Sequence, residues 1–176
     1  MKTIRIAALV AAAPLALAAN SAPVWVQHVD TIPAPQDKPF PGTITLKVDA
    51  TDLDRRIYTV QERIPVAASG STTLLMPKWL PGNHSPRGQI EKLAGLVIRA
   101  NGKIIPWTRD PVDVFAFTVN VPDGVANLDV SFQFLSATDG DQGRIVVTPD
   151  MLSLQWEAVS LYPQAISRGK SRSRRA

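Results

Sequence analysis

The sequence of 176 residues contains no cysteine, so neither a disulfide nor a catalytic thiol is available to it. Its two histidines, His28 and His84, lie far apart and outside any H-E-x-x-H pattern, in which two histidines one helical turn apart face the same metal ion. A tetrahedral zinc site needs three protein ligands, usually His or Cys with a carboxylate. We therefore expect no metal ion or other cofactor in this chain.

The sequence also lacks convincing patterns for a serine nucleophile paired with histidine and for a calcium-binding loop. His84 and Ser85 are adjacent, but neighbouring residues in a loop rarely point at each other, and no G-x-S-x-G turn is present to expose a serine nucleophile. Asp139 and Asp141 belong to a turn that lacks the complete pattern of a calcium loop, so a solvated turn is the favoured interpretation. No catalytic and no metal-binding residue is predicted.

The body of the chain has no excess of positive charge, although the formal net charge is +4. Two of the 19 Lys and Arg residues lie within residues 1–5 and five within residues 168–176, which leaves 12 basic against 15 acidic residues between them. This balance gives no basic stripe for binding nucleic acid. The Arg/Ser-rich tail, residues 164–176, is expected to be disordered. It either binds RNA or anionic lipid or, as we favour, reflects a shifted reading frame or a premature end.

The first residues are typical of an export signal. Lys2 and Arg5 precede an apolar run, residues 6–19, that is too short to span a bilayer. An A-x-A pattern ending at Ala18 predicts a signal peptide over residues 1–18, which is removed on export to the periplasm or the medium. Cleavage one or four residues later, and a retained membrane anchor, stay open as alternatives. No later run is apolar enough to span, so no membrane contact is expected after cleavage.

The body of the chain predicts an all-β fold. Proline and glycine recur at short intervals, and no stretch shows a sustained helical repeat of apolar positions. Alternation over Thr43–Ala50 predicts a strand with one face in a core, and Arg56–Val66 predicts a second. In the second strand one face consists of Tyr58, Val60, Glu62 and Ile64, and Pro65 marks its end or an edge.

Further strands and turns complete this prediction. Asn101-Gly102 between two apolar runs predicts a hairpin with a type I′ turn. The remaining strands are expected at Val112–Val121, Leu128–Ala137, Arg144–Thr148 and Leu152–Trp156. About eight strands without helical crossovers predict an antiparallel β-sandwich or a strongly bent sheet. We expect a single β domain, residues 43–163, preceded by an extended arm, residues 19–42.

The segment Leu74–Gly88 contains three prolines and two glycines, which predict a rigid, irregular loop that leaves the sheet. Pro81-Gly82 suits a type II turn. Trp79 is interpreted as a packing anchor of this loop in preference to a platform for a ligand. The polar residues that the loop would present to a partner or substrate are Asn83, His84, Ser85 and Arg87. The alternative, weighed about equally, is that they satisfy the backbone of the loop.

The run Met76-Pro-Lys-Trp-Leu-Pro-Gly-Asn-His-Ser-Pro-Arg-Gly88 resembles a P-x-W-x-P-G signature in the amino-terminal domain of glycyl aminopeptidase-like metallopeptidases, the sixty-first metallopeptidase family. The neighbouring landmarks fit as well, since Arg63-Ile-Pro-Val66 precedes the loop and Trp107 follows it. The resemblance covers approximately Trp25 to Pro163.

The resemblance implies a plan in which a β domain comes first, then a thermolysin-like catalytic domain with H-E-x-x-H and zinc, and often a PDZ module. No residue of this chain matches a catalytic or zinc-binding position of that plan. We therefore expect a non-catalytic and truncated amino-terminal domain, whose partner is the missing catalytic domain and whose role is to help wall the substrate cleft. The alternative is an independent periplasmic module that uses the loop from Trp79 to Arg87 to bind a peptide or glycan.

Overall fold

The computed structural model describes residues 32, 34, 39–80, 82, 84–139, 141 and 146–164. The expected signal peptide, His28 and the Arg/Ser-rich tail beyond Gln164 lie outside the described residues, as does most of the arm that precedes Pro39. Within the described part of the chain, no helix is both long and apolar enough to cross a membrane.

The described residues form short strands joined by turns, with two single 3-10 turns. In chain order these elements are β1 (Thr45–Asp52), β2 (Ile57–Pro65), β3 (Gly70–Leu75), η1 (Ile90–Lys92), β4 (Leu93–Ala100), β5 (Lys103–Ile105), β6 (Trp107–Arg109), β7 (Ala116–Val121), β8 (Asn127–Leu135), β9 (Val146–Val147), β10 (Leu152–Ser153), η3 (Trp156–Val159) and β11 (Tyr162–Pro163).

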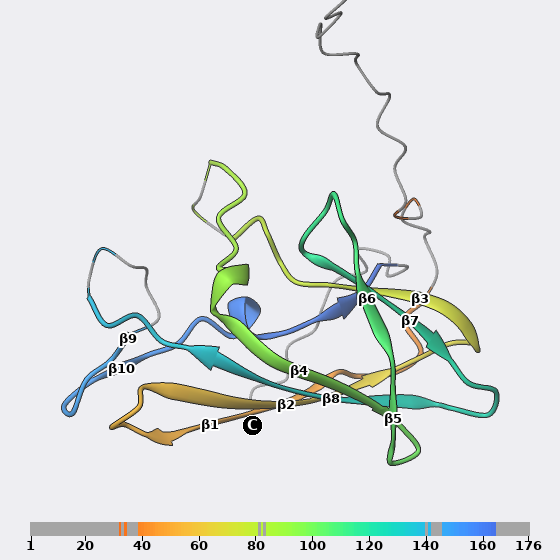
Figure 1. Ribbon diagram of the computed structural model, residues 1–176, viewed down its shortest axis with the longest axis horizontal. Helices are drawn as coiled ribbons and strands as arrows, with labels where there is room; N and C mark the ends of the chain where they lie inside the picture. Colours follow the sequence, from red (N-terminus) through yellow and green to blue (C-terminus); the bar gives the residue numbers. More distant parts are fainter. Residues whose placement is uncertain are drawn as a thin grey trace, which may run out of the picture.

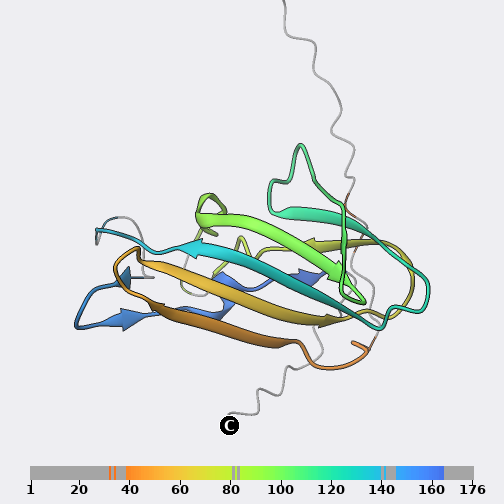
Figure 2. The ribbon, with the colours of Figure 1, turned by 60° about the horizontal axis from the view of Figure 1, so that its bottom comes forward.

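The strands form two main antiparallel sheets and one small hairpin. The larger sheet has the order β1-β2-β8-β4-β5, the smaller has the order β11-β3-β7-β6, and β10 pairs with β9 alone. Figures 1 and 2 show the five-stranded sheet as one layer, with β3, β6 and β7 forming a second layer beside it. The prediction of an all-β, antiparallel fold is confirmed.

Both sheets contribute to one hydrophobic core, because each presents its alternate apolar residues to the space between the layers. Tyr58, Val60, Glu62 and Ile64 of β2 share one face, as predicted, and the structure shows that this face is buried. The matching face of β8 is Leu128, Val130, Phe132 and Phe134, and the smaller sheet adds Leu74, Phe117, Val119 and Val121. Removing this apolar area from water stabilises the fold by about 25 cal/mol for each Å².

The predicted hairpin at Asn101-Gly102 is also confirmed. Ala100 of β4 pairs with Lys103 of β5, so only two residues form the loop. Asn101 has φ 48° and Gly102 has φ 79°, the left-handed values that a type I′ turn requires at both positions.

Several predicted strand boundaries are wrong. The strand expected at Val112–Val121 begins only at Ala116, because the Asp110 carboxylate accepts hydrogen bonds from the N–H groups of Val112 and Asp113 and holds that stretch in a turn. The strand expected at Leu152–Trp156 ends at Ser153 as β10, and a 3-10 turn, η3, begins at Trp156. Of the strand expected at Arg144–Thr148, the described residues contain only the two residues of β9. The first strand continues two residues beyond Ala50.

Adjacent residues on opposite faces of β8 provide a test of the core. Phe134 is fully buried, whereas Leu135 points outward and is exposed. We expect Phe134→Ala to lower the free energy of unfolding by about 3–5 kcal/mol, because it leaves a cavity in the core. Leu135→Ala should cost less than about 1 kcal/mol, since exposed positions tolerate substitution. Urea denaturation of both variants checks this, and equal losses would contradict the assigned faces.

Candidate functional site

The loop between β3 and η1 contains every residue that the sequence singled out as a candidate for binding. Two backbone hydrogen bonds close its base. The N–H of Met76 donates to the carbonyl of Phe115 over 2.9 Å, and the N–H of Gly88 donates to the carbonyl of Lys78 over 3.0 Å. In Figure 1 this yellow-green loop rises from the same side of the molecule as the green loop that joins β6 to β7.

Gly88 permits the two arms of the loop to touch. A Cβ atom at this position would lie 2.3 Å from the carbonyl oxygen of Pro77 and 2.8 Å from the ring of Phe115. Real Cβ atoms essentially never come so close to backbone, so no other residue fits here without a shift of the loop. The last glycine of the predicted loop segment is therefore required by packing at its base.

The expectation that Trp79 anchors the loop is wrong. The Trp79 side chain is 59% exposed, whereas the next residue, Leu80, is only 7% exposed and belongs to the core with Met76. Adjacent side chains of an extended segment point to opposite sides, so only one of the two can face the core. Leu80 takes that position, and the indole is left facing solvent.

The other predicted loop residues lie as follows. Gly82 has φ +77°, the left-handed value that the predicted turn requires of it, while Pro81 and Asn83 lie outside the described residues. His84 is exposed. Ser85 is half-buried, and its hydroxyl accepts a hydrogen bond of 3.0 Å from Nε of Arg87. This hydrogen bond joins two side chains of the same loop and restricts their conformations.

An ion pair joins the loop to its neighbour, and sequence reasoning did not identify it. Lys78 Nζ lies 2.5 Å from Oδ2 of Asp113, and the other oxygen of Asp113 accepts a hydrogen bond from the N–H of Phe115. Two exposed apolar side chains, Val112 and Val114, flank Asp113. We call Trp79, Val112 and Val114, together with this ion pair, the two-loop surface. No pattern in the sequence pairs Lys78 with a residue 35 positions away.

Glu62 is the one buried carboxylic acid among the described core positions. Its Oε2 accepts a hydrogen bond of 2.9 Å from the N–H of Leu161, and its Oε1 has no partner among the described residues. Burial raises the pKa of this carboxyl from its ordinary value of 4.5 to about 8, although the bond from Leu161 opposes the shift. At neutral pH the carboxyl is therefore mostly protonated. The sequence placed Glu62 on one face with Tyr58, Val60 and Ile64 but gave no sign of its burial or of its partner.

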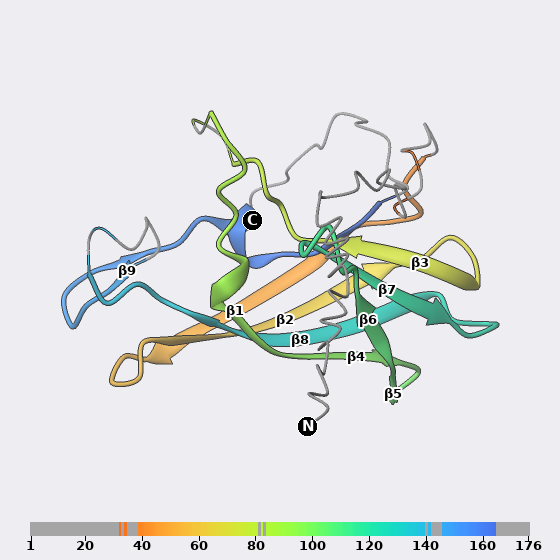
Figure 3. The same cartoon turned by 45° about the horizontal axis from the view of Figure 1, so that its top comes forward.

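The partner of Glu62 belongs to a C-terminal segment that crosses between the sheets. Ala158, Val159 and Leu161 are buried in the core. Tyr162 then pairs with Leu75 of β3, and the N–H of Gln164 donates to the carbonyl of Thr73 over 2.8 Å. Figure 3 shows this blue segment running from the β9–β10 hairpin toward β3.

The described residues do not offer a metal site. They contain no group of three or more His, Cys, Asp or Glu side chains that could hold an ion. Asp139 and Asp141 are exposed in their turn, and neither they nor the exposed His84 belong to such a group in the described structure. These side chains do not fit the zinc ion that the family resemblance implies for a complete enzyme, so we derive no chemistry through a metal.

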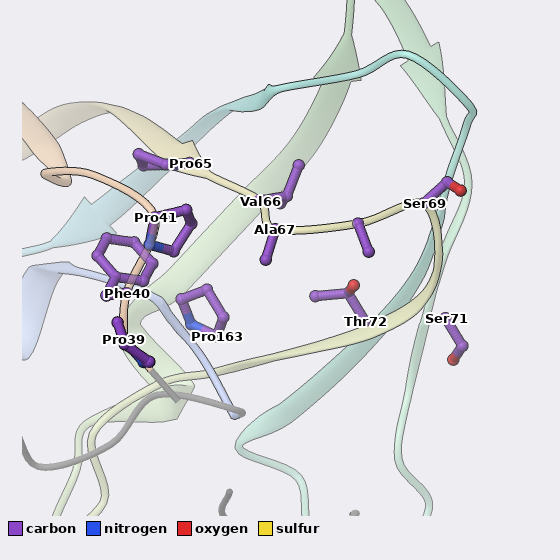
Figure 4. A pocket seen from close by; sticks show the side chains of 11 residues that line it. Pro39, Phe40, Pro41, Pro65, Val66, Ala67, Ser69, Ser71, Thr72 and Pro163 are labelled. Atoms are coloured by element: carbon purple, nitrogen blue, oxygen red, sulfur yellow. The ribbon is translucent and has the colours of Figure 1, made fainter. Parts of the chain in front are cut away.

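A groove of about 300 Å³ lies at the end of β2, where the arm before β1 meets the β2–β3 turn. In Figure 4, Pro39, Phe40, Pro41 and Pro163 gather on one side of it, opposite Ala67 and Thr72. Among the described residues its lining carries no charged side chain, and it consists of Pro39, Phe40, Pro41, Pro65, Val66, Ala67, Ala68, Ser69, Ser71, Thr72 and Pro163. The sequence predicted an extended arm here but not a groove.

Comparisons with known proteins define the class of the chain. A family model described as the Peptidase M61 N-terminal domain matches residues 45–172, which include all the strands described above. The chain therefore belongs to the Peptidase M61 N-terminal domain family, and the predicted resemblance is confirmed. It is thus a peptidase-associated amino-terminal domain.

A solved structure of an aminopeptidase N family protein from Idiomarina loihiensis is also similar, with a TM-score of 0.47 and 19% sequence identity. The similar region covers 56% of this chain and only 16% of that one. A search of curated proteins finds no match.

The buried carboxyl of Glu62 predicts an unusual dependence of stability on pH. Because its folded pKa of about 8 lies above the ordinary value of 4.5, its contribution is complete below pH 4.5 and is lost as the pH rises toward 8. The loss is at most about 1.4 kcal/mol per pH unit in that window. Glu62→Gln cannot ionise, so the difference in unfolding free energy between variant and natural protein should grow in favour of the variant as the pH rises. Urea titrations from pH 5 to 9 measure it, and a constant difference would contradict a buried, protonated Glu62.

Proposed function

We propose that this chain serves as the non-catalytic amino-terminal domain of a glycyl aminopeptidase-like zinc metallopeptidase, in which it packs against the catalytic domain and helps to wall the substrate cleft. Membership of the Peptidase M61 N-terminal domain family supports the association with a peptidase. The two-loop surface supports the packing, because the Lys78–Asp113 ion pair brings the loop that exposes Trp79 against the loop that exposes Val112 and Val114. This surface is the observation that carries the proposal.

The two-loop surface has the character of an interface core. Large apolar side chains that are exposed together mark contact sites, and tryptophan is enriched among the residues that dominate binding energies. The backbone hydrogen bonds of Met76 and Gly88 and the Lys78–Asp113 pair hold both loops in place before any partner arrives. A surface that is already ordered loses little conformational entropy on binding, which favours affinity.

In this proposal the zinc ion and the catalytic groups belong to the catalytic domain, and this chain forms part of the wall of the substrate cleft. The described residues lack a cluster of metal ligands, so their role in the reaction would be to position the catalytic domain and to limit access to its cleft. We also propose that the domain acts outside the cytoplasm, in the periplasm or after secretion, because residues 1–18 are typical of an export signal.

An independent peptide-binding module is the second candidate function. From the sequence we expected such a module to bind through the loop from Trp79 to Arg87, but we now place its site in the groove beside Pro163, because extended peptides bind in apolar grooves next to strand edges. The two functions use different residues, so they can be tested separately.

The packing proposal can be tested with a separately produced catalytic domain of a glycyl aminopeptidase-like peptidase. We expect the purified chain alone to be inert toward glycyl and alanyl chromogenic substrates in the presence of zinc. It should bind the catalytic domain in a calorimetric titration. Val112→Asp should weaken that binding by about tenfold or more, because it places a charge in the apolar part of the interface.

Ile104→Asp is the matched control. Ile104 is 66% exposed and Val112 is 61% exposed, but Ile104 lies on β5, away from both loops. The control should bind the catalytic domain within about twofold of the natural protein, as expected of a residue outside the interface. Equal effects of the two substitutions, or no binding by the natural protein, would refute the two-loop surface as the contact.

A further inference from the structure

One edge of β3 is only partly paired. On one side β7 pairs with every residue of β3, whereas on the other side β11 pairs only with Leu74 and Leu75. The carbonyl of Thr73 accepts a hydrogen bond from Gln164 on this second edge. Because alternate residues of a strand direct their N–H and C=O groups to the same edge, those of Ser71 face this edge too. No strand in the described part of the chain covers it beside Ser71.

The uncharged groove lies directly beside this edge, since Ser71 and Thr72 belong to its lining. Its walls are mainly aliphatic and proline side chains, and its polar side chains are hydroxyls. A charged ligand would lose its hydration here without gaining an ion-pair partner from the described lining, which is costly. The lining therefore selects for an uncharged, mainly aliphatic ligand.

The groove is also preformed. Prolines at 39, 41, 65 and 163 restrict the backbone on its rim. The arm lies close against the end of β2, where a Cβ atom on Gly42 would be 3.0 Å from the ring of Pro65. Because proline has no N–H group, these rim residues cannot donate a backbone hydrogen bond to a ligand. The strand edge at Ser71 is where a ligand backbone can pair as an added strand.

We propose that the groove binds an extended, uncharged, aliphatic peptide segment of a partner protein, which adds a short strand to β3 beside Ser71. The chain itself provides the example, because the extended segment Tyr162–Pro163 already pairs with this edge and its proline forms part of the groove wall. A bound peptide would continue that pairing, with backbone hydrogen bonds giving affinity and the aliphatic walls selecting the side chains. This inference does not depend on the proposed packing against a catalytic domain.

The test uses the full chain and the blocked peptide acetyl-Val-Ala-Val-Ala-amide as the probe. We expect the peptide to shift the backbone amide resonance of Ser71 in NMR spectra, because that amide gains a hydrogen-bond acceptor. Two altered peptides should bind at least about tenfold more weakly: one with N-methyl groups in place of its backbone N–H groups, and one with lysine in place of the central valine.

Two variants of the protein locate the site. Ala67 is exposed on the groove wall, so Ala67→Glu introduces a charge there without disturbing the core, and it should weaken binding by about tenfold or more. Ala126 is also exposed but does not line the groove, and Ala126→Glu should leave binding unchanged.

Three results would overturn the proposal. The first is no shift at Ser71, or equal binding by both variants. The second is binding only after residues 165–176 are deleted, which would mean that the chain's own C-terminal residues occupy the groove. The third is displacement of the peptide by dimer formation at high protein concentration, which would mean that a second copy is the occupant. Failure here would leave the test with Val112→Asp unaffected, since Val112 does not line the groove.

Discussion

The hydrogen bond from the N–H of Leu161 to Glu62 joins the five-stranded sheet to the C-terminal segment, which forms part of the groove wall. Glu62 lies on a central strand of the five-stranded sheet, and Leu161 belongs to the segment that pairs with β3 in the other sheet. One carboxyl group thus links the two layers through the C-terminal segment. Beyond Leu161, Pro163 forms part of the groove wall, and β3 leads directly into the two-loop surface.

A carboxyl group is not the most stabilising residue for a core position. Burying its charge is costly, so the group remains protonated near neutral pH, and only one of its oxygens has a partner among the described residues. An apolar residue would fill the space without this cost, but it could not accept a hydrogen bond from the N–H of Leu161. The carboxyl contributes specificity for one arrangement of the C-terminal segment, because hydrogen bonds in a core favour one arrangement of the chain over similar ones. The position of the C-terminal segment, and with it the edge of β3, follows from that preference.

Local patterns predicted the parts of the fold that local chemistry determines. Alternation sorted the residues of β2 onto its two faces, and Asn101-Gly102 identified the hairpin, because both depend on neighbours in the chain. The contacts that build the candidate surfaces join distant residues, as Lys78 joins Asp113 and Glu62 joins Leu161, and no local pattern encodes such pairs. Trp79 was misjudged for the same reason, since the choice between two adjacent apolar residues is made by the packing of Leu80 in the core.

Amide hydrogen exchange at Leu161 tests the central claim most directly, because it reports on the one N–H group that Glu62 binds. We expect Glu62→Ala to accelerate exchange at Leu161 and Gln164 by about tenfold or more, while amides in the paired centre of β8 keep most of their protection. Unchanged protection at Leu161 in this variant would contradict the account, because the C-terminal segment would then be held in place without Glu62.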